Sequence, residues 1–294
     1  MYVPQTKPFT SMLLKNTIDA FAKSYPLLGV TKIGTSRIGR PIYALTIGHG
    51  GRAVLINAAH HANEWITSVI AIKFLQECVM SSDTKWMDEV TLHIIPMVNP
   101  DGVDLVTGGL GRLRPVYQTA KKMAAENDIF PQCWKANILG IDLNSNYPAN
   151  WDNARKSKYE RGYTKPGPRD YVGEYPLCEP ETSAMAAYTI VNEFSHTISL
   201  HTQGEEIYWL YQNYNPPRAK ELALRLSAAS GYKLEEVPDE SSHAGYRDWF
   251  ISKFNRPGMT IECGLGENPL PISDFDSIYK KVAPLLWECI FFRS

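Results

Sequence analysis

Long apolar runs and a leader segment are both absent from this sequence. No stretch of the 294 residues approaches the roughly 20 apolar residues that a membrane-spanning helix needs. The first twenty residues lack the basic flank and the uninterrupted apolar core of a signal peptide. We therefore expect a cytoplasmic protein without a membrane partner, or a secreted or spore-associated one if a targeting segment precedes this chain.

An excess of one charge and closely spaced cysteines are missing as well. Thirty lysines and arginines are balanced by 31 aspartates and glutamates, which gives a formal net charge of −1 and no basic arm. Binding to nucleic acid is therefore not expected. The five cysteines are scattered, odd in number and form no CxxC pair, which favours reduced thiols over a zinc ribbon. Nothing in the sequence indicates an oligomeric state.

The patterns that are present predict a single α/β domain over residues 1–294. Segments rich in β-branched and aromatic residues predict strands at 41–48, 52–58, 90–97, 196–201, 206–210 and 258–263. Helical patterns occupy 64–79, 180–194 and 216–231. This alternation favours a mixed, mostly parallel, twisted sheet with helices on both faces. The proline- and glycine-rich segment 161–176 is expected to form a long loop.

A candidate metal site follows the second of these strands, in "NAAHHANEWITS". His61 and Glu64 are three residues apart at the start of a predicted helix, so one turn can direct both side chains to a single point. The third ligand must come from elsewhere, and His201 ends the predicted strand 196–201. Two histidines and one glutamate, with a position left for water, form a catalytic zinc set. His60 is expected to point away from it.

Five segments in order give a wider resemblance: "HHANEWIT", "MVNPDGVDL", "WKANILGIDLNSNYPANW", "SLHTQGEEIYW" and "MTIECGLGENPLP". With these segments, the chain resembles the zinc carboxypeptidase family over nearly its whole length. The resemblance implies a carboxypeptidase-like sheet of about eight strands, one Zn²⁺ per chain and the hydrolysis of peptides.

The resemblance also assigns roles to three further residues. Asp142 matches the position that orients the first histidine ligand, here His61; its alternative is a solvated loop aspartate. Glu262 is implied to be the general base that takes a proton from zinc-activated water. Lys135 lies where the family usually carries an arginine that polarises the scissile carbonyl, and its alternative is an ordinary surface lysine.

The chain departs from the family pattern at two places. Where carboxypeptidases hold a substrate's C-terminal carboxylate with asparagine and arginine, this sequence has Asn144 and Ser145, so the charged clamp is absent. Arg247 lies at the place that, in the family, forms the base of the pocket for the residue after the cut, where a cation would select an anionic side chain; its alternative is a surface arginine. Glu205 or Glu206 could meet an amine on the same substrate residue.

Together these features resemble the branch of the family that cuts bacterial peptidoglycan peptides between γ-D-glutamate and meso-diaminopimelate. We therefore expect a zinc metallopeptidase of the cell wall, with a link to sporulation and a peptidoglycan-derived peptide as its partner. The alternative enzyme is a zinc carboxypeptidase that releases C-terminal acidic residues, which Arg247 would also suit. A non-catalytic zinc- or peptide-binding module is the third hypothesis, but His61, Glu64, His201 and Glu262 are all retained.

Overall fold

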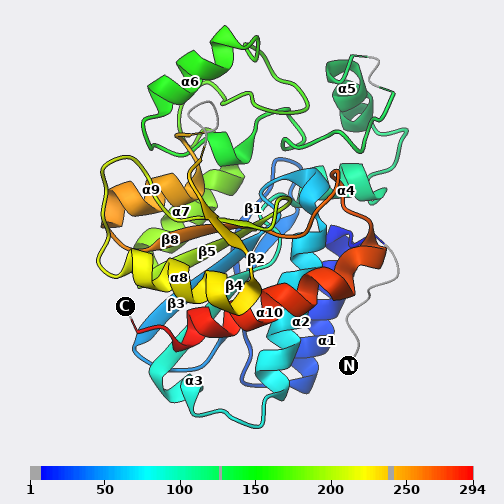
Figure 1. Ribbon diagram of the computed structural model, residues 1–294. Coiled ribbons are helices and arrows are strands. Elements are labelled where there is room, and N and C mark those ends of the chain that lie inside the picture. The colour runs from blue at the N-terminus through cyan, green and yellow to red at the C-terminus, as the bar shows by residue number, and fades with distance from the viewer. Residues whose placement is uncertain (1–7, 126–127, 238–241, 294) are drawn as a thin grey trace.

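The computed structural model describes residues 8–125, 128–237 and 242–293. Eight strands form one sheet in the order β1-β2-β4-β3-β5-β8-β6-β7 (Figure 1). The strands are β1 Gly29–Thr35, β2 Pro41–Ile47, β3 Arg52–Ala58, β4 Val90–Ile95, β5 His196–His201, β6 Glu206–Tyr208, β7 Lys233–Glu235 and β8 Gly258–Glu262. Four of the seven strand pairs in the described chain are parallel, so the predicted mixed, mostly parallel sheet is confirmed.

The helices lie on both faces of this sheet and at one of its ends. The α-helices are α1 Ser11–Ser24, α2 Ile66–Met80, α3 Trp86–Glu89, α4 Pro100–Thr107, α5 Pro115–Met123, α6 Trp151–Glu160, α7 Pro180–Asn192, α8 Ala219–Ser230, α9 Tyr246–Phe254 and α10 Phe275–Phe291. Short 3₁₀ turns are η1 Ala62–Glu64, η2 Leu143–Ser145 and η4 Ile272–Asp274. None of the helices in the described ranges combines the length and apolar character that a bilayer crossing demands.

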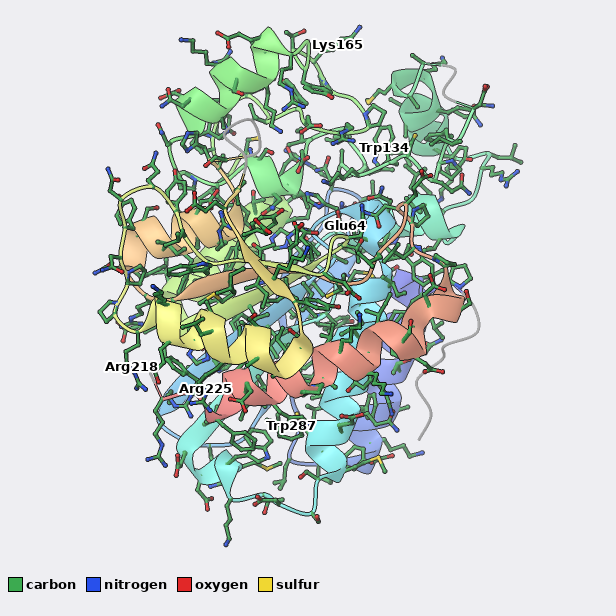
Figure 2. All side chains as sticks on the ribbon, viewed as in Figure 1. Glu64, Trp134, Lys165, Arg218, Arg225 and Trp287 are labelled. Atoms are coloured by element: carbon green, nitrogen blue, oxygen red, sulfur yellow. The ribbon has the colours of Figure 1, made fainter. Side chains whose placement is uncertain are left out.

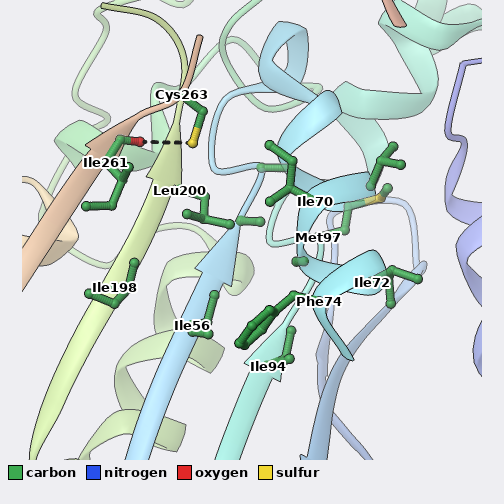
Figure 3. Packing of buried hydrophobic residues seen from close by; sticks show 14 of the residues in the cluster. Ile56, Ile70, Ile72, Phe74, Ile94, Met97, Ile198, Leu200, Ile261 and Cys263 are labelled. Atoms are coloured by element: carbon green, nitrogen blue, oxygen red, sulfur yellow. Dashed lines mark hydrogen bonds between the residues drawn. The ribbon is translucent and has the colours of Figure 1, made fainter. Parts of the chain in front are cut away.

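The central strands are buried on both sides, which explains their nearly continuous apolar sequences. On one face, Ile56 and Leu200 pack with α1, α2, α8 and α10 in the larger core cluster. Figure 3 shows Phe74 and Ile70 of α2 beside these strand residues. On the other face, Leu55 packs with α7 and α9 in a second cluster. Because helices cover both faces of the central strands, these strands can present side chains to a substrate only at their ends.

A buried carboxyl group at the start of α7 makes stability depend on pH. Glu181 has no exposed surface, and its Oε1 accepts the N–H of Arg37 at 3.2 Å while Oε2 has no partner in the described chain. Arg37 places its guanidinium on Glu179 instead, at 2.8 Å. Burial, reinforced by the charges of Glu179 and Asp101, raises the pKa of Glu181 from 4.5 to about 8.

Replacing Glu181 by glutamine should therefore stabilise the protein at alkaline pH. Between pH 4.5 and about 8 the folded state binds one proton more than the unfolded state at this group. As the pH rises through that window, the free energy of unfolding of the native chain should fall by about 1.4 kcal/mol per pH unit. The glutamine variant, which has no proton to lose there, should not show this fall. Thermal unfolding curves of both proteins at pH 5, 7 and 9 measure the difference. A difference in melting temperature between the two proteins that is the same at pH 5, 7 and 9 would show that folding does not raise the pKa of this carboxyl group.

Candidate active site

The site forms where three parallel strands end side by side. β3, β5 and β8 are neighbours, with Ala58 paired to Leu200 and His201 paired to Glu262. The carboxyl ends of parallel strands meet at one edge of a sheet, so the residues just after β3 converge with those that end β5 and β8. Figure 2 shows Glu64 at this edge, in the middle of the molecule.

His61, Glu64 and His201 form the one group of potential metal ligands found within the described residues. Nδ1 of His61 lies 2.8 Å from Oε1 of Glu64, and Nδ1 of His201 lies 2.9 Å from Oε2 of Glu64 and 3.1 Å from Nδ1 of His61. All three side chains are buried. The 3₁₀ turn η1 directs the first two side chains to the same point, as the spacing predicts.

Asp142 determines which nitrogen of His61 faces this point. Its Oδ1 lies 3.3 Å from Nε2 of His61, so in a neutral ring Nε2 carries the hydrogen and Nδ1 presents a lone pair. That lone pair faces a carboxylate oxygen of Glu64 at 2.8 Å, which is repulsive unless a proton or a metal cation lies between them. Burial opposes a charge on His61, but Glu64 and Asp142 outweigh it and raise the pKa of His61, so a proton fills this place when no metal is bound. The buried nitrogen and oxygen donors therefore fit a zinc ion.

Both carboxylates at this point are ionised. Burial opposes the charge on Glu64, but His61 and His201 outweigh it and hold the pKa of Glu64 well below its usual range. For Asp142, burial is again outweighed, by His61 and then by Lys135, so the pKa of Asp142 is lowered too. Two negative charges are thus available to compensate a divalent cation.

Glu262 differs from these two acids because its side-chain carboxyl makes no hydrogen bond within the described residues. It ends β8 beside His201 and lines the cleft. Burial and then the charge of Glu64 raise the pKa of Glu262 to about 8. A carboxyl group with a pKa near neutral pH can take up and release a proton. A cation held next to Glu64 would lower this pKa by favouring the ionised form.

Lys135 lies on the other side of Glu64 rather than at the surface. Its Nζ is 3.7 Å from Oε1 of Glu64, and its backbone C=O accepts the N–H of Ala62, which ties it to the turn η1. Burial opposes its charge, but Glu64, Asp142 and Glu262 outweigh that effect and raise the pKa of Lys135. A positive charge is therefore fixed in the cleft.

Asn144 and Ser145 line the same cleft on the turn η2. Oδ1 of Asn144 accepts the N–H of Tyr246 at 3.0 Å at the start of α9, which leaves its NH₂ group to donate into the cleft. Ser145 is buried, and its hydroxyl has no hydrogen bond within the described residues. At this position the protein presents neutral donors only.

Arg247 also reaches the cleft, but it is already paired. Its Nε donates to Oδ1 of Asp248 at 3.0 Å, a second N–H donates to the same oxygen, and both residues are buried. The guanidinium carbon lies 6.0 Å from the centre of the Tyr208 ring. The cleft lining thus carries a cation and an anion side by side here, where the sequence had indicated a cation alone.

Other residues named from the sequence lie outside the cleft. His60 hydrogen-bonds to the hydroxyl of Tyr147 at 3.0 Å. Glu205 is bound by Lys281 at 2.6 Å, and Glu206 accepts the hydroxyl hydrogen of Tyr208 at 2.7 Å. Neither acid lines the cleft.

The cleft has a volume of about 810 Å³, large enough for several residues of a peptide. Several of its polar residues were not singled out from the sequence: Lys158, Arg169, Asp170, Gln203, Tyr208, Glu267 and Asn268. Arg169 and Asp170 belong to the long proline- and glycine-rich loop, whose length was the available signal. Their placement depends on two hydrogen bonds that the N–H groups of Lys135 and Ala136 donate to the C=O of Pro168, which no local pattern encodes.

Comparisons with known proteins agree with this geometry. The family model described as zinc carboxypeptidase matches residues 14–281. "Gamma-D-glutamyl-L-diamino acid endopeptidase 1" of Lysinibacillus sphaericus is 40% identical, with 92% of this chain and 69% of that protein aligned. "Uncharacterized protein YqgT" of Bacillus subtilis (strain 168) is 36% identical, with 100% and 80% aligned. A crystal structure of thrombin activatable fibrinolysis inhibitor, 19% identical, superposes with a TM-score of 0.76 over 98% of this chain and 76% of that one. The chain therefore belongs to the zinc carboxypeptidase family of metallopeptidases and is a hydrolase.

Proposed function

We propose that this enzyme hydrolyses the amide bond between the γ-carboxyl group of D-glutamate and a diamino acid, diaminopimelate, in peptidoglycan-derived peptides. The name of the Lysinibacillus sphaericus relative supports this substrate class. The observation that carries the proposal is that the neutral side chain of Ser145 and the cation of Arg247 line the same cleft. This substrate class would place the activity in turnover of the bacterial cell wall.

We propose that His61, Glu64 and His201 hold one zinc ion per chain. When bound, zinc supplies Lewis acidity that polarises a carbonyl oxygen and acidifies water. Asp142 keeps the His61 ring oriented, with Nδ1 facing the metal position.

Glu262 and Lys135 would then carry out the proton transfer and the charge stabilisation. The Glu262 carboxylate accepts a proton from the attacking water and returns it to the leaving amine, as the family resemblance implies. Nζ of Lys135, fixed beside Glu64, offers a positive charge to the oxygen of the scissile carbonyl as negative charge develops on it. Lysine acts here as a point charge, without the two-pronged geometry of a guanidinium group.

Ser145 and Arg247 would set the specificity. The NH₂ group of Asn144 and the hydroxyl of Ser145 can hydrogen-bond a substrate carbonyl, whether it belongs to a free C-terminus or to a following residue. Without a charged clamp, a C-terminal extension after the cut residue is tolerated. Arg247 retains N–H groups that are not used by Asp248, and these can bind the side-chain carboxylate of diaminopimelate.

The test is mass spectrometry of the products formed by the zinc-loaded enzyme from two peptides. L-Ala-γ-D-Glu-meso-diaminopimelate and the same peptide extended by D-Ala should both be cut at the γ-glutamyl bond. Arg247→Ala should lower kcat/KM on both peptides by more than tenfold. Without the guanidinium group, the side-chain carboxylate of diaminopimelate would be buried without an opposite charge. The matched peptide with lysine, which lacks the side-chain carboxylate, should be affected much less.

Two results would replace this proposal. Efficient release of C-terminal glutamate, with no cleavage of the D-Ala-extended peptide, would establish the acidic carboxypeptidase instead. If Arg247→Ala lowered kcat/KM equally on the diaminopimelate and lysine peptides, Arg247 would not be the residue that recognises the side-chain carboxylate.

A further inference from the structure

Arg169 is placed in the cleft next to Lys135 by the backbone. The C=O of Pro168 accepts the N–H of Lys135 at 2.8 Å and that of Ala136 at 2.9 Å. These two bonds fasten the long loop to the segment that carries Lys135. The next residue, Arg169, lines the cleft, and its side chain is 55% exposed. A second cation therefore lies on the same wall as the residue assigned to the scissile carbonyl.

Two cations of this wall share one carboxylate. Nε of Arg169 donates to Oδ2 of Asp170 at 2.5 Å, while Lys158 donates to Oδ1 of the same carboxylate. One negative charge thus serves two positive ones. Asp142 lies close enough to act on Arg169 through its charge, but its oxygens contact His61 and the backbone N–H groups of Asn144 and Asp170, so it forms no ion pair with this guanidinium.

The end of the Arg169 side chain is available to a ligand. Neither of its Nη atoms makes a hydrogen bond within residues 8–125, 128–237 and 242–293. A guanidinium group presents parallel N–H donors that match the two oxygens of a carboxylate. The wall is therefore complementary to an anionic group of a substrate bound beside Lys135.

A γ-linked glutamyl residue has such a group. When the bond to be cut uses the γ-carbonyl, the α-carboxylate stays ionised and is separated from that carbonyl carbon by two methylene groups and the α-carbon. An α-linked residue with a non-acidic side chain has no carboxylate at this distance. We propose that Arg169 binds the free α-carboxylate of the D-glutamyl residue and so selects γ-linked substrates, an inference that rests on the function proposed above.

The experiment compares two substrates that differ only in this carboxylate: L-Ala-γ-D-Glu-meso-diaminopimelate and its α-carboxamide, the isoglutaminyl peptide. Arg169→Gln should lower kcat/KM about tenfold on the carboxylate peptide, because a charge-assisted hydrogen bond in a partly exposed site is lost. The loss should appear in KM, with kcat little changed, since this contact is present in the ground state and the transition state alike. On the carboxamide the variant should match the native enzyme.

Lys165→Gln is the matched control. It removes one positive charge from the same loop, but Lys165 is exposed, is not part of the cleft lining and lies far from Glu64 in Figure 2. Both peptides should be cut by this variant at native rates.

The outcomes separate this inference from the function on which it rests. If the native enzyme cuts both peptides equally well and Arg169→Gln changes neither rate, recognition of the α-carboxylate is wrong while the γ-glutamyl peptidase stands. Equal losses on both peptides give Arg169 a role unrelated to that carboxylate and also overturn the inference. Cleavage of neither peptide by native enzyme refutes both proposals.

Discussion

Replacing Glu262 by glutamine should lower kcat by about 10² to 10⁴-fold, the range typical for loss of a general base. The amide has nearly the same shape as the carboxylate but cannot accept a proton from water. The Glu262 carboxyl makes no hydrogen bond within the described residues, and its backbone C=O, which accepts the N–H of Glu205, is unchanged by the substitution, so no internal hydrogen bond is broken. The melting temperature and the zinc content should therefore stay at native values.

Glu206→Gln provides the control for this result. Glu206 is the direct neighbour of Glu262 on strand β6, but its carboxylate is bonded to the hydroxyl of Tyr208 outside the cleft. The same chemical change there should alter kcat by a few-fold at most. Turnover of Glu262→Gln within tenfold of the native rate would mean that another group takes the proton.

Removal of the metal should abolish hydrolysis and lower the melting temperature. A chelator leaves the carboxylate of Glu64 facing two imidazole nitrogens in a buried site, and a ligand that binds only the folded state raises stability by mass action. Addition of one equivalent of Zn²⁺ should restore activity and the melting temperature together. His201→Ala should bind less than one zinc per chain and should not be rescued.

His60→Gln tests whether the adjacent histidine takes part. His60 is buried next to the proposed zinc ligands, but its Nε2 hydrogen-bonds to the hydroxyl of Tyr147. This variant should therefore still bind one zinc per chain. Elemental analysis of the folded protein measures the stoichiometry. Full activity after exhaustive chelation, or loss of zinc from His60→Gln with His201→Ala unaffected, would contradict the proposed ligand set.

The core strands were predictable because their sequences are apolar on both faces. β3 and β5 begin and end within a residue of the positions indicated by their patterns. β1 was missed because it is an edge strand whose first four residues are exposed, so burial imposes no alternation on it. β7 is only three residues long, with its central residue partly buried. Such strands depend on the neighbour with which they pair.

Local spacing and the family resemblance were enough to predict the residues around the proposed metal. They did not predict the charged residues with which other side chains of the cleft pair. The HxxE spacing brought His61 and Glu64 together through one turn, a local effect. The pairing of Arg247 with Asp248 depends on side-chain direction at the start of α9, and the position of Arg169 depends on a backbone contact 33 residues back along the chain, between Pro168 and Lys135. Long-range contacts of this kind are not visible in a single sequence.

The distance along the chain between the proposed ligands has a consequence for how the protein acquires its metal. His61 and His201 are separated by 140 positions and meet only after β3 and β5 have paired in parallel. Closing so large a loop carries an entropic cost before any contact across the sheet is gained. Of the three proposed ligands, an unfolded or partly folded chain therefore brings together only His61 and Glu64. We therefore expect zinc to bind after the sheet has assembled. The ion should then slow unfolding of the native state without changing the rate of folding.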